Sequence, residues 1–241
     1  MLAISNNVFQ PINLRRLKMA KEILNPVTRS RRKKFISEKH LPTRFYLRGT
    51  ISQPFKFSHE AVDGKRFCES FIDVNDEYGT IKVRVMAEEK DIMGFEEGDR
   101  VKITGSFRSS NTVDKERQCT HLKIYLFVIK IVRDDSDFED FTEVYIRGVI
   151  CRIDKVREIK YTSEREYPYN KKIDFEIKGH NGPRAFIAPV RAYDDLAEQI
   201  AGMSLGARIC IRGVWVTREY LSSNDTMETT YEVVIKEILD G

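Results

Sequence analysis

Two short phrases in this chain each occur twice, in the same order. Residues 45–51 (FYLRGTI) return as residues 144–150 (VYIRGVI), and residues 98–105 (GDRVKITG) return as residues 206–213 (GARICIRG). The spacing between the two phrases agrees in both copies to within about ten residues. Because 241 residues are enough for two domains of ordinary small size, the repeat predicts two copies of one β-domain.

The first copy has the pattern of a small β-barrel. Alternation of apolar and polar residues predicts a short helix over residues 88–95, a polar loop over 109–120, and strands over 46–51, 65–74, 80–86, 100–107 and 122–132. Three strands, a short helix and two further strands form the element order of the five-stranded OB fold.

The same order returns after an acidic segment. Residues 134–143 are rich in Asp and Glu and are predicted to link two domains, residues 44–133 and 144–241. In the second copy we expect a helix over 193–201 and strands over 145–153 (extended over 156–161), 173–178, 184–190, 208–217 and 231–239. The predicted fold class is therefore all-β, with two tandem five-stranded OB barrels, each with a short helix between strands 3 and 4.

Residues 1–43 differ from the rest of the chain in charge. They hold ten Lys and Arg against two Glu, a net charge of +8, whereas the whole chain has +4 and the remainder therefore −4. We expect a basic, largely disordered arm that contacts phosphate or an acidic surface, and the alternative is a solvated tail without a partner. The predicted phosphate contacts are Arg29, Arg31, Arg32, Lys33 and Lys34.

No pattern typical of an enzyme is present. The sequence has no Gly-rich phosphate loop and no His-x-x-x-His, and its four cysteines are scattered without a Cys-x-x-Cys. Neither a metal, a cofactor nor a disulfide framework is therefore expected. No apolar run approaches the ~20 residues that span a bilayer, and no signal-peptide core is found. We expect a non-enzymatic cytoplasmic protein that does not contact a membrane.

Two aromatic residues and two cations fall on one face of the predicted second and third strands. By strand alternation Phe67 and Phe71 face outward, beside Lys82 and Arg84. Rings that stack on bases and cations that contact phosphates are what single-stranded nucleic acid requires.

This interpretation has an alternative, in which the two rings pack beneath the arm, a loop or the other barrel. Glu69 and Asp73 on the same face also oppose the binding of phosphate. Trp215 and Phe107 stand at equivalent positions just past the glycine of each fourth strand, which favours a structural role for both.

Several short motifs carry a family resemblance. Residues 51–60 (ISQPFKFSHE), 98–101 (GDRV) and 105–111 (GSFRSSN), followed by 148–151 (GVIC) and 218–220 (REY), stand in a consistent order. Together they resemble a tandem OB-fold single-stranded DNA-binding protein family of Gram-positive bacteria and their phages. The resemblance covers about residues 44–240. It implies a nucleoid-associated protein that binds and protects single-stranded DNA in replication, recombination or repair, without strong sequence preference.

Two departures from that family concern its aromatic positions. Residues 190–193 (VRAY) stand where members carry Ala-Trp-Gly, and Cys68 and Ser70 occupy the usual aromatic positions of the second strand. The predicted DNA contacts in this sequence are Phe55, Lys56, Phe67, Phe71, Lys82, Arg84, Arg108, Lys115, Arg117, Arg157, Lys160, Tyr161 and Arg218.

Other functions stay open at this point. The net −4 outside the arm favours a protein–protein interaction module of a replication complex, whose arm alone contacts nucleic acid. A nuclease would need a carboxylate cluster, but the nearest acids, Asp73, Asp76 and Glu77, resemble a turn. RNA is not excluded as the ligand, because stacking is indifferent to the sugar unless a 2′-hydroxyl is contacted. The chain is compatible with a homodimer and with a monomer.

Overall fold

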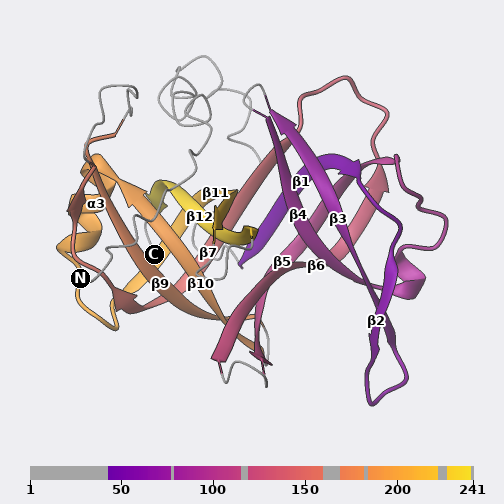
Figure 1. Cartoon of the computed structure of the whole chain (residues 1–241), viewed down its shortest axis with the longest axis horizontal. Coiled ribbons are helices and arrows are strands. Elements are labelled where there is room, and N and C mark those ends of the chain that lie inside the picture. The colour runs from indigo at the N-terminus through magenta and orange to yellow at the C-terminus, as the bar shows by residue number, and fades with distance from the viewer. Residues whose placement is uncertain are drawn as a thin grey trace, which may run out of the picture.

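A computed structural model describes residues 43–76, 79–114, 119–159, 169–181, 184–221 and 227–239 (Figure 1). These residues are mostly β-strand, which confirms the all-β class. They include one α-helix, α3 (Asp194–Ala201), and one 3-10 helix, η3 (Glu89–Asp91). No described helix is long and apolar enough to cross a membrane.

The described strands form one sheet that spans both copies of the repeat. The first half consists of β1 (Arg44–Ile51), β2 (Lys56–Glu60), β3 (Arg66–Asp76), β4 (Gly79–Glu88), β5 (Arg100–Asp114) and β6 (Cys119–Arg133). The second half consists of β7 (Phe141–Ile153), β8 (Arg157–Glu158), β9 (Lys171–Asn181), β10 (Arg184–Tyr193), β11 (Arg208–Leu221) and β12 (Met227–Leu239).

The repeat in the sequence becomes a symmetry of the sheet. The strand order is β2-β3-β4-β6-β5-β1-β7-β11-β12-β10-β9-β8, so each half mirrors the other about the centre. There β1 and β7 pair antiparallel, and Phe45 pairs with Val144, its equivalent in the repeated phrase. Additional pairings of β3 with β1 and of β7 with β9 close each half back on itself.

The side chain of Trp215 joins the two halves. It is fully buried in β11, with its ring edge-on to Phe45 at 5.5 Å between centroids and 5.8 Å from Phe107. Phe107 is also fully buried and packs against Phe186 of the second half. The predicted structural role of Trp215 and Phe107 is therefore confirmed, and the same aromatic cluster contains residues from both halves.

Three segments differ from the prediction. Residues 88–95 form only the three-residue η3 instead of a short helix, and Gly94 follows it with a φ of +84°. Residues 56–60, expected in a loop, form β2, and most of the expected polar loop 109–120 extends β5 and β6 into a long hairpin. β2 pairs with β3, and the extensions of β5 and β6 pair with each other. Because these segments lie away from the core, they lack the hydrophobic alternation that predicts strands.

The acidic segment between the halves is packed against basic side chains of the first half. Asp134 is 4% exposed and forms ion pairs with Arg48 and with Lys102, the latter at 2.8 Å. Burial alone would raise the pKa of Asp134, but the hydrogen bonds it accepts, first from Lys102, hold the pKa well below its usual range. Asp140 pairs with Arg100 at 2.9 Å. The irregular part of the segment ends at residue 140, because β7 starts directly after it.

Gly49 lies where no side chain fits, and its substitution gives a test of the packing. A Cβ at this position would stand 2.4 Å from the carbonyl oxygen of Asp73 and 2.9 Å from a methyl of Ile72. We expect Gly49→Ala to lower the free energy of unfolding by roughly 1–3 kcal/mol in urea denaturation followed by circular dichroism. Gly202→Ala is the control, because its Cβ would meet nothing closer than 3.5 Å. Equal losses in the two variants would contradict the packing described.

Candidate nucleic-acid interface

The outer face of the first half is formed by β3, β4, β6 and β5, in that spatial order. In β3 the side chains of Cys68, Ile72 and Val74 are buried in the core, as predicted. Strand alternation therefore places Phe67 and Phe71 on the opposite, outer face.

The strand register aligns aromatic and cationic residues into a row across this face. Phe71 of β3 pairs with Arg84 of β4, and Tyr125 of β6 pairs with Arg108 of β5. The parallel register of β4 with β6 places Arg84 beside Tyr125. Rings and cations thus alternate over four strands, and we call Phe71, Arg84, Tyr125 and Arg108 the aromatic–cation row.

The exposure of the rings on this face differs from the prediction. Phe67 is only 9% exposed and Tyr125 8%, because both pack in a small apolar cluster on the outer side of the sheet. His59 of β2 stacks on Phe67 at 5.0 Å between ring centroids. The expectation of Phe67 as an open platform is therefore wrong, because this cluster and His59 of the unpredicted β2 cover its ring. Phe71 and Phe127 are partly exposed on this face.

The acid Glu69 is neutralised within the face. Arg84 Nη2 donates to both carboxylate oxygens of Glu69 at 2.8 Å, and Lys123 Nζ lies 3.6 Å away. Burial alone would raise the pKa of Glu69, but the contacts with Arg84 and Lys123 hold this pKa below its usual value. Arg84 also lies 5.8 Å from the centroid of Phe71. Arg84 is thus already paired with Glu69, whereas Lys82 is exposed on the same strand.

Arg108 is the side chain whose environment most favours an anion. Its guanidinium lies 3.6 Å from the centroid of Phe127, and its buried Nε has no hydrogen-bond partner within the described part of the chain. Burial first, and the positive charge of Arg184 second, lower the pKa of Arg108. No carboxylate of the described residues forms an ion pair with it. Phe127 is not among the contacts predicted from the sequence, although strand alternation over residues 122–132 places it on this face.

The second half does not repeat this chemistry at the equivalent positions. The repeat aligns Thr50 with Val149. Thr50 pairs with Asp73 and Val149 pairs with Lys178, so Asp73 and Lys178 are equivalent positions. From that register, the counterparts of the aromatic–cation row are Glu176, Pro189, Glu232 and Val216. Two carboxylates and no cation therefore stand where the first half has two rings and two arginines.

An arginine on that second face is held by acids. Arg191 of β10 is buried and pairs with Asp174 at 2.5 Å and with Glu232 at 2.9 Å. Beside it, Tyr193 stacks on Tyr169 at 4.3 Å, and both rings are buried. Tyr193, the residue in place of the family's usual tryptophan, is therefore not an open stacking surface.

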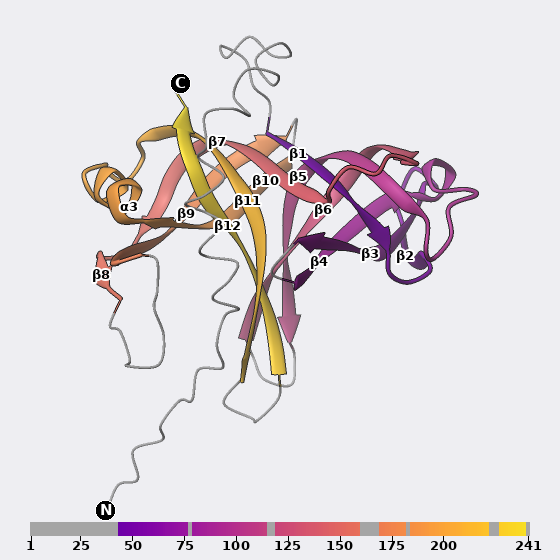
Figure 2. The same ribbon diagram turned by 90° about the horizontal axis from the view of Figure 1, so that it is seen from above.

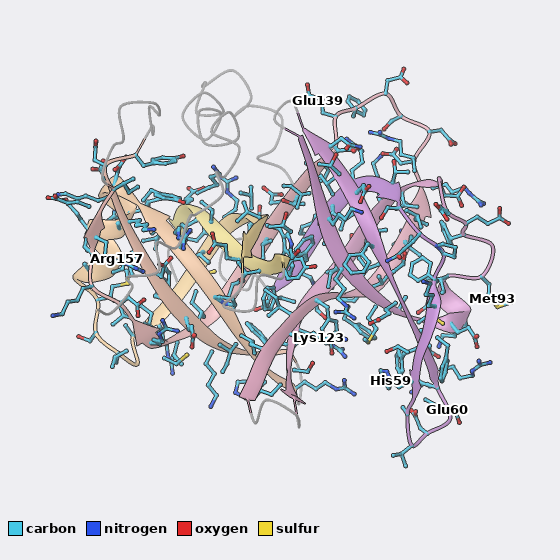
Figure 3. The ribbon with its side chains drawn as sticks, viewed as in Figure 1. His59, Glu60, Met93, Lys123, Glu139 and Arg157 are labelled. Carbon is cyan, nitrogen blue, oxygen red and sulfur yellow. The ribbon has the colours of Figure 1, made fainter. Side chains whose placement is uncertain are left out.

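The remaining predicted contacts are dispersed. Phe55 packs against the core, and Lys56 is exposed on β2. Arg157 is exposed but pairs with Asp174 at 2.5 Å, and it lies on the opposite side of the molecule from His59 (Figure 3). Arg218 pairs in register with Thr230 in the β11–β12 hairpin. Outside the described residues lie Arg29, Arg31, Arg32, Lys33, Lys34, Lys115, Arg117, Lys160 and Tyr161.

Two long hairpins flank the outer face. Figure 2 shows the β5–β6 and β11–β12 hairpins projecting from the same side of the molecule. The first of them carries Arg108 and Lys123, so these cations stand at its base and beside the aromatic–cation row.

The arrangement is similar to that of solved single-stranded DNA binding proteins. The wild-type protein of Thermus aquaticus matches with a TM-score of 0.60 at 16% identity, covering 82% of this chain and 91% of that chain. A deletion mutant of the same protein matches with a TM-score of 0.61 at 15% identity, covering 82% and 93%. At such identities the likeness shows the fold, which is the all-β OB type. No protein-family model and no curated protein sequence matches this chain.

Proposed function

We propose that this protein binds single-stranded DNA without strong sequence preference, through the outer face of its first half. The observation that carries the proposal is the aromatic–cation row, which ends in an Arg108 that no described carboxylate balances. Rings stack on any base, and cations contact any phosphate, so such a face is tolerant of sequence. The Thermus aquaticus structures of the same fold are named as single-stranded DNA binding proteins, which supports the same ligand.

In the same proposal, each repeat is one five-stranded OB barrel. The barrels comprise residues 44–133 and 144–241, with the acidic segment 134–143 between them and the basic arm 1–43 before them. The symmetric strand order and the closing pairs β3–β1 and β7–β9 support this division. The resemblance to the Gram-positive family supports a cytoplasmic role in replication, recombination or repair, with replication proteins as partners; the assembly is a homodimer or a monomer.

The two halves are unequal in this proposal. The first half stacks on bases, whereas the counterpart positions of the second half hold Glu176 and Glu232, each paired with an arginine, and carry no ring on which a base could stack. Each chain therefore offers one stacking face.

Phe71→Ala tests this face directly. Because Phe71 is partly exposed, we expect the variant to fold and to bind fluorescein-labelled oligo-dT roughly 5- to 150-fold more weakly, the loss of about 1–3 kcal/mol of stacking. Affinity is measured by fluorescence anisotropy and folding by thermal melting. Glu176→Ala, at the equivalent position of the second half, is the matched control and should bind no worse than the parent. A folded Phe71→Ala with unchanged affinity would remove the proposed face.

A protein–protein interaction module is the second candidate, because the chain outside the arm has a net charge of −4. In that case Phe71→Ala leaves oligo-dT binding unchanged, and the arm alone supplies the affinity. A parallel titration with oligo-rU decides between DNA and RNA, because a preference requires contact with the 2′-hydroxyl.

A further inference from the structure

The end of β9 and the first part of β10 meet the first half directly beside Arg108. The backbone N–H of Ile187 donates to Ser109 Oγ at 2.8 Å, and Asn181 Nδ2 donates to the carbonyl oxygen of Phe107 at 2.6 Å. The acceptors are the two neighbours of Arg108 in β5. Strands β9 and β10 are thus held against β5 at the position where the aromatic–cation row ends.

This contact brings a second arginine to the same place. Arg184 is exposed at the start of β10 and pairs in register with Asn181, the residue bonded beside Arg108. The positive charge of Arg184 contributes to the lowered pKa of Arg108, in agreement with the position that the two hydrogen bonds give to the start of β10. No ion pair with a described carboxylate is formed by either arginine. Two like charges without a balancing acid repel each other unless an anion lies between them.

We propose that Arg108 and Arg184 form a phosphate clamp at the junction of the two halves. This inference rests on the proposed function, since the anion would be a backbone phosphate of the bound single strand. Planar guanidinium groups match phosphate with two parallel hydrogen bonds, and stacking on Phe127 holds that of Arg108 in place. The strand would leave the first half at Arg108 and continue onto the second half at Arg184, although the outer face of the second half carries no stacking row.

Arg184→Ala is the informative variant, because its exposed side chain can be removed without disturbing the core. We expect it to weaken oligo-dT binding about tenfold at low salt, as for the loss of one charged hydrogen-bonded contact. The slope of log affinity against log salt should fall by about 0.7, the value for one phosphate on a single strand. The control is Arg152→Ala, an exposed arginine of the same half that pairs with Asp154 and Glu176.

Oligonucleotide length separates a clamp from a general charge effect. On the shortest oligo-dT that still binds the first half, Arg184→Ala and the parent should have equal affinity. On longer oligo-dT the affinity of the parent should exceed that of Arg184→Ala about tenfold, because only the longer oligonucleotides reach the junction. Arg108→Ala combined with Arg184→Ala should cost less than the sum of the two single losses, because both side chains contact one phosphate.

The outcomes separate this inference from the function on which it rests. If Arg184→Ala matches Arg152→Ala at every length while Phe71→Ala still weakens binding, the clamp is wrong and the stacking face stands. If Phe71→Ala also has no effect, the proposed function itself is wrong. A loss for Arg184→Ala that is the same at all lengths would also overturn the crossing at the junction.

Discussion

Deleting residues 1–40 is expected to flatten the salt dependence of oligo-dT binding by about 3–4 units of slope. The motivating observation is the +8 of residues 1–43 against the −4 of the rest. Each phosphate neutralised on a single strand contributes about −0.7 to the slope, so the expected change corresponds to about five phosphate contacts. Between 50 and 200 mM salt, the parent should therefore lose about a hundredfold more affinity than the deletion variant.

A charge-neutral arm separates the effect of charge from that of length. The control changes the basic block to glutamine and retains the full chain, and it should reproduce most of the flattening. The changed residues are Arg29, Arg31, Arg32, Lys33 and Lys34. An unchanged slope after deletion would assign the arm to a protein partner or to none. Complete loss of binding would instead favour the interaction module, because the rest of the chain would then hold no DNA.

Trp215→Ala is expected to lower the free energy of unfolding by about 3–5 kcal/mol, the cost of removing a large aromatic side chain from a core. Its ring is fully buried and contacts Phe45 and Phe107 of the first half and Tyr231 of the second. The cavity would therefore open at the junction of the two halves. Urea denaturation followed by far-ultraviolet circular dichroism measures the loss without needing tryptophan emission.

Phe57→Ala is the matched control, because Phe57 is an aromatic side chain that is 55% exposed on β2. Its effect should stay within about 0.5 kcal/mol, as for an ordinary surface substitution. If Trp215→Ala were equally mild, the aromatic cluster would not hold the halves together. The burial of Trp215 also means that a base cannot stack on it, so any change in its emission on DNA binding would report a change at the junction.

The repeat, the alternation and the arm were accessible from the sequence. The two repeated phrases fall at mirrored places of the strand order, in β1 and β7 and in β5 and β11, and alternation placed Cys68, Ile72 and Val74 in the core. The helix over residues 193–201 is α3, which buries Ala197 and Ile200. These features depend on residues near each other in the chain, or on a repeat that can be aligned by eye.

The candidate site was predictable only in part. Alternation found Phe71, Lys82 and Arg84, but it treated every outward side chain as accessible. It could not show that β2 covers Phe67, because β2 lacks an apolar pattern. It also could not show that Arg84 is bound by Glu69, since this ion pair depends on the register between two strands.

The sequence by itself determined the fold class, the duplication and which side chains face the core, because strand periodicity is a local property of the chain. Only the tertiary structure decided which outward side chains remain available to a ligand. Phe67 and Arg157 lose that availability to contacts with other segments, whereas Arg108 and Arg184 form no ion pair with a described carboxylate. The reason is physical: exposure and charge balance are set by residues that are distant in sequence and become neighbours only when the sheet is formed.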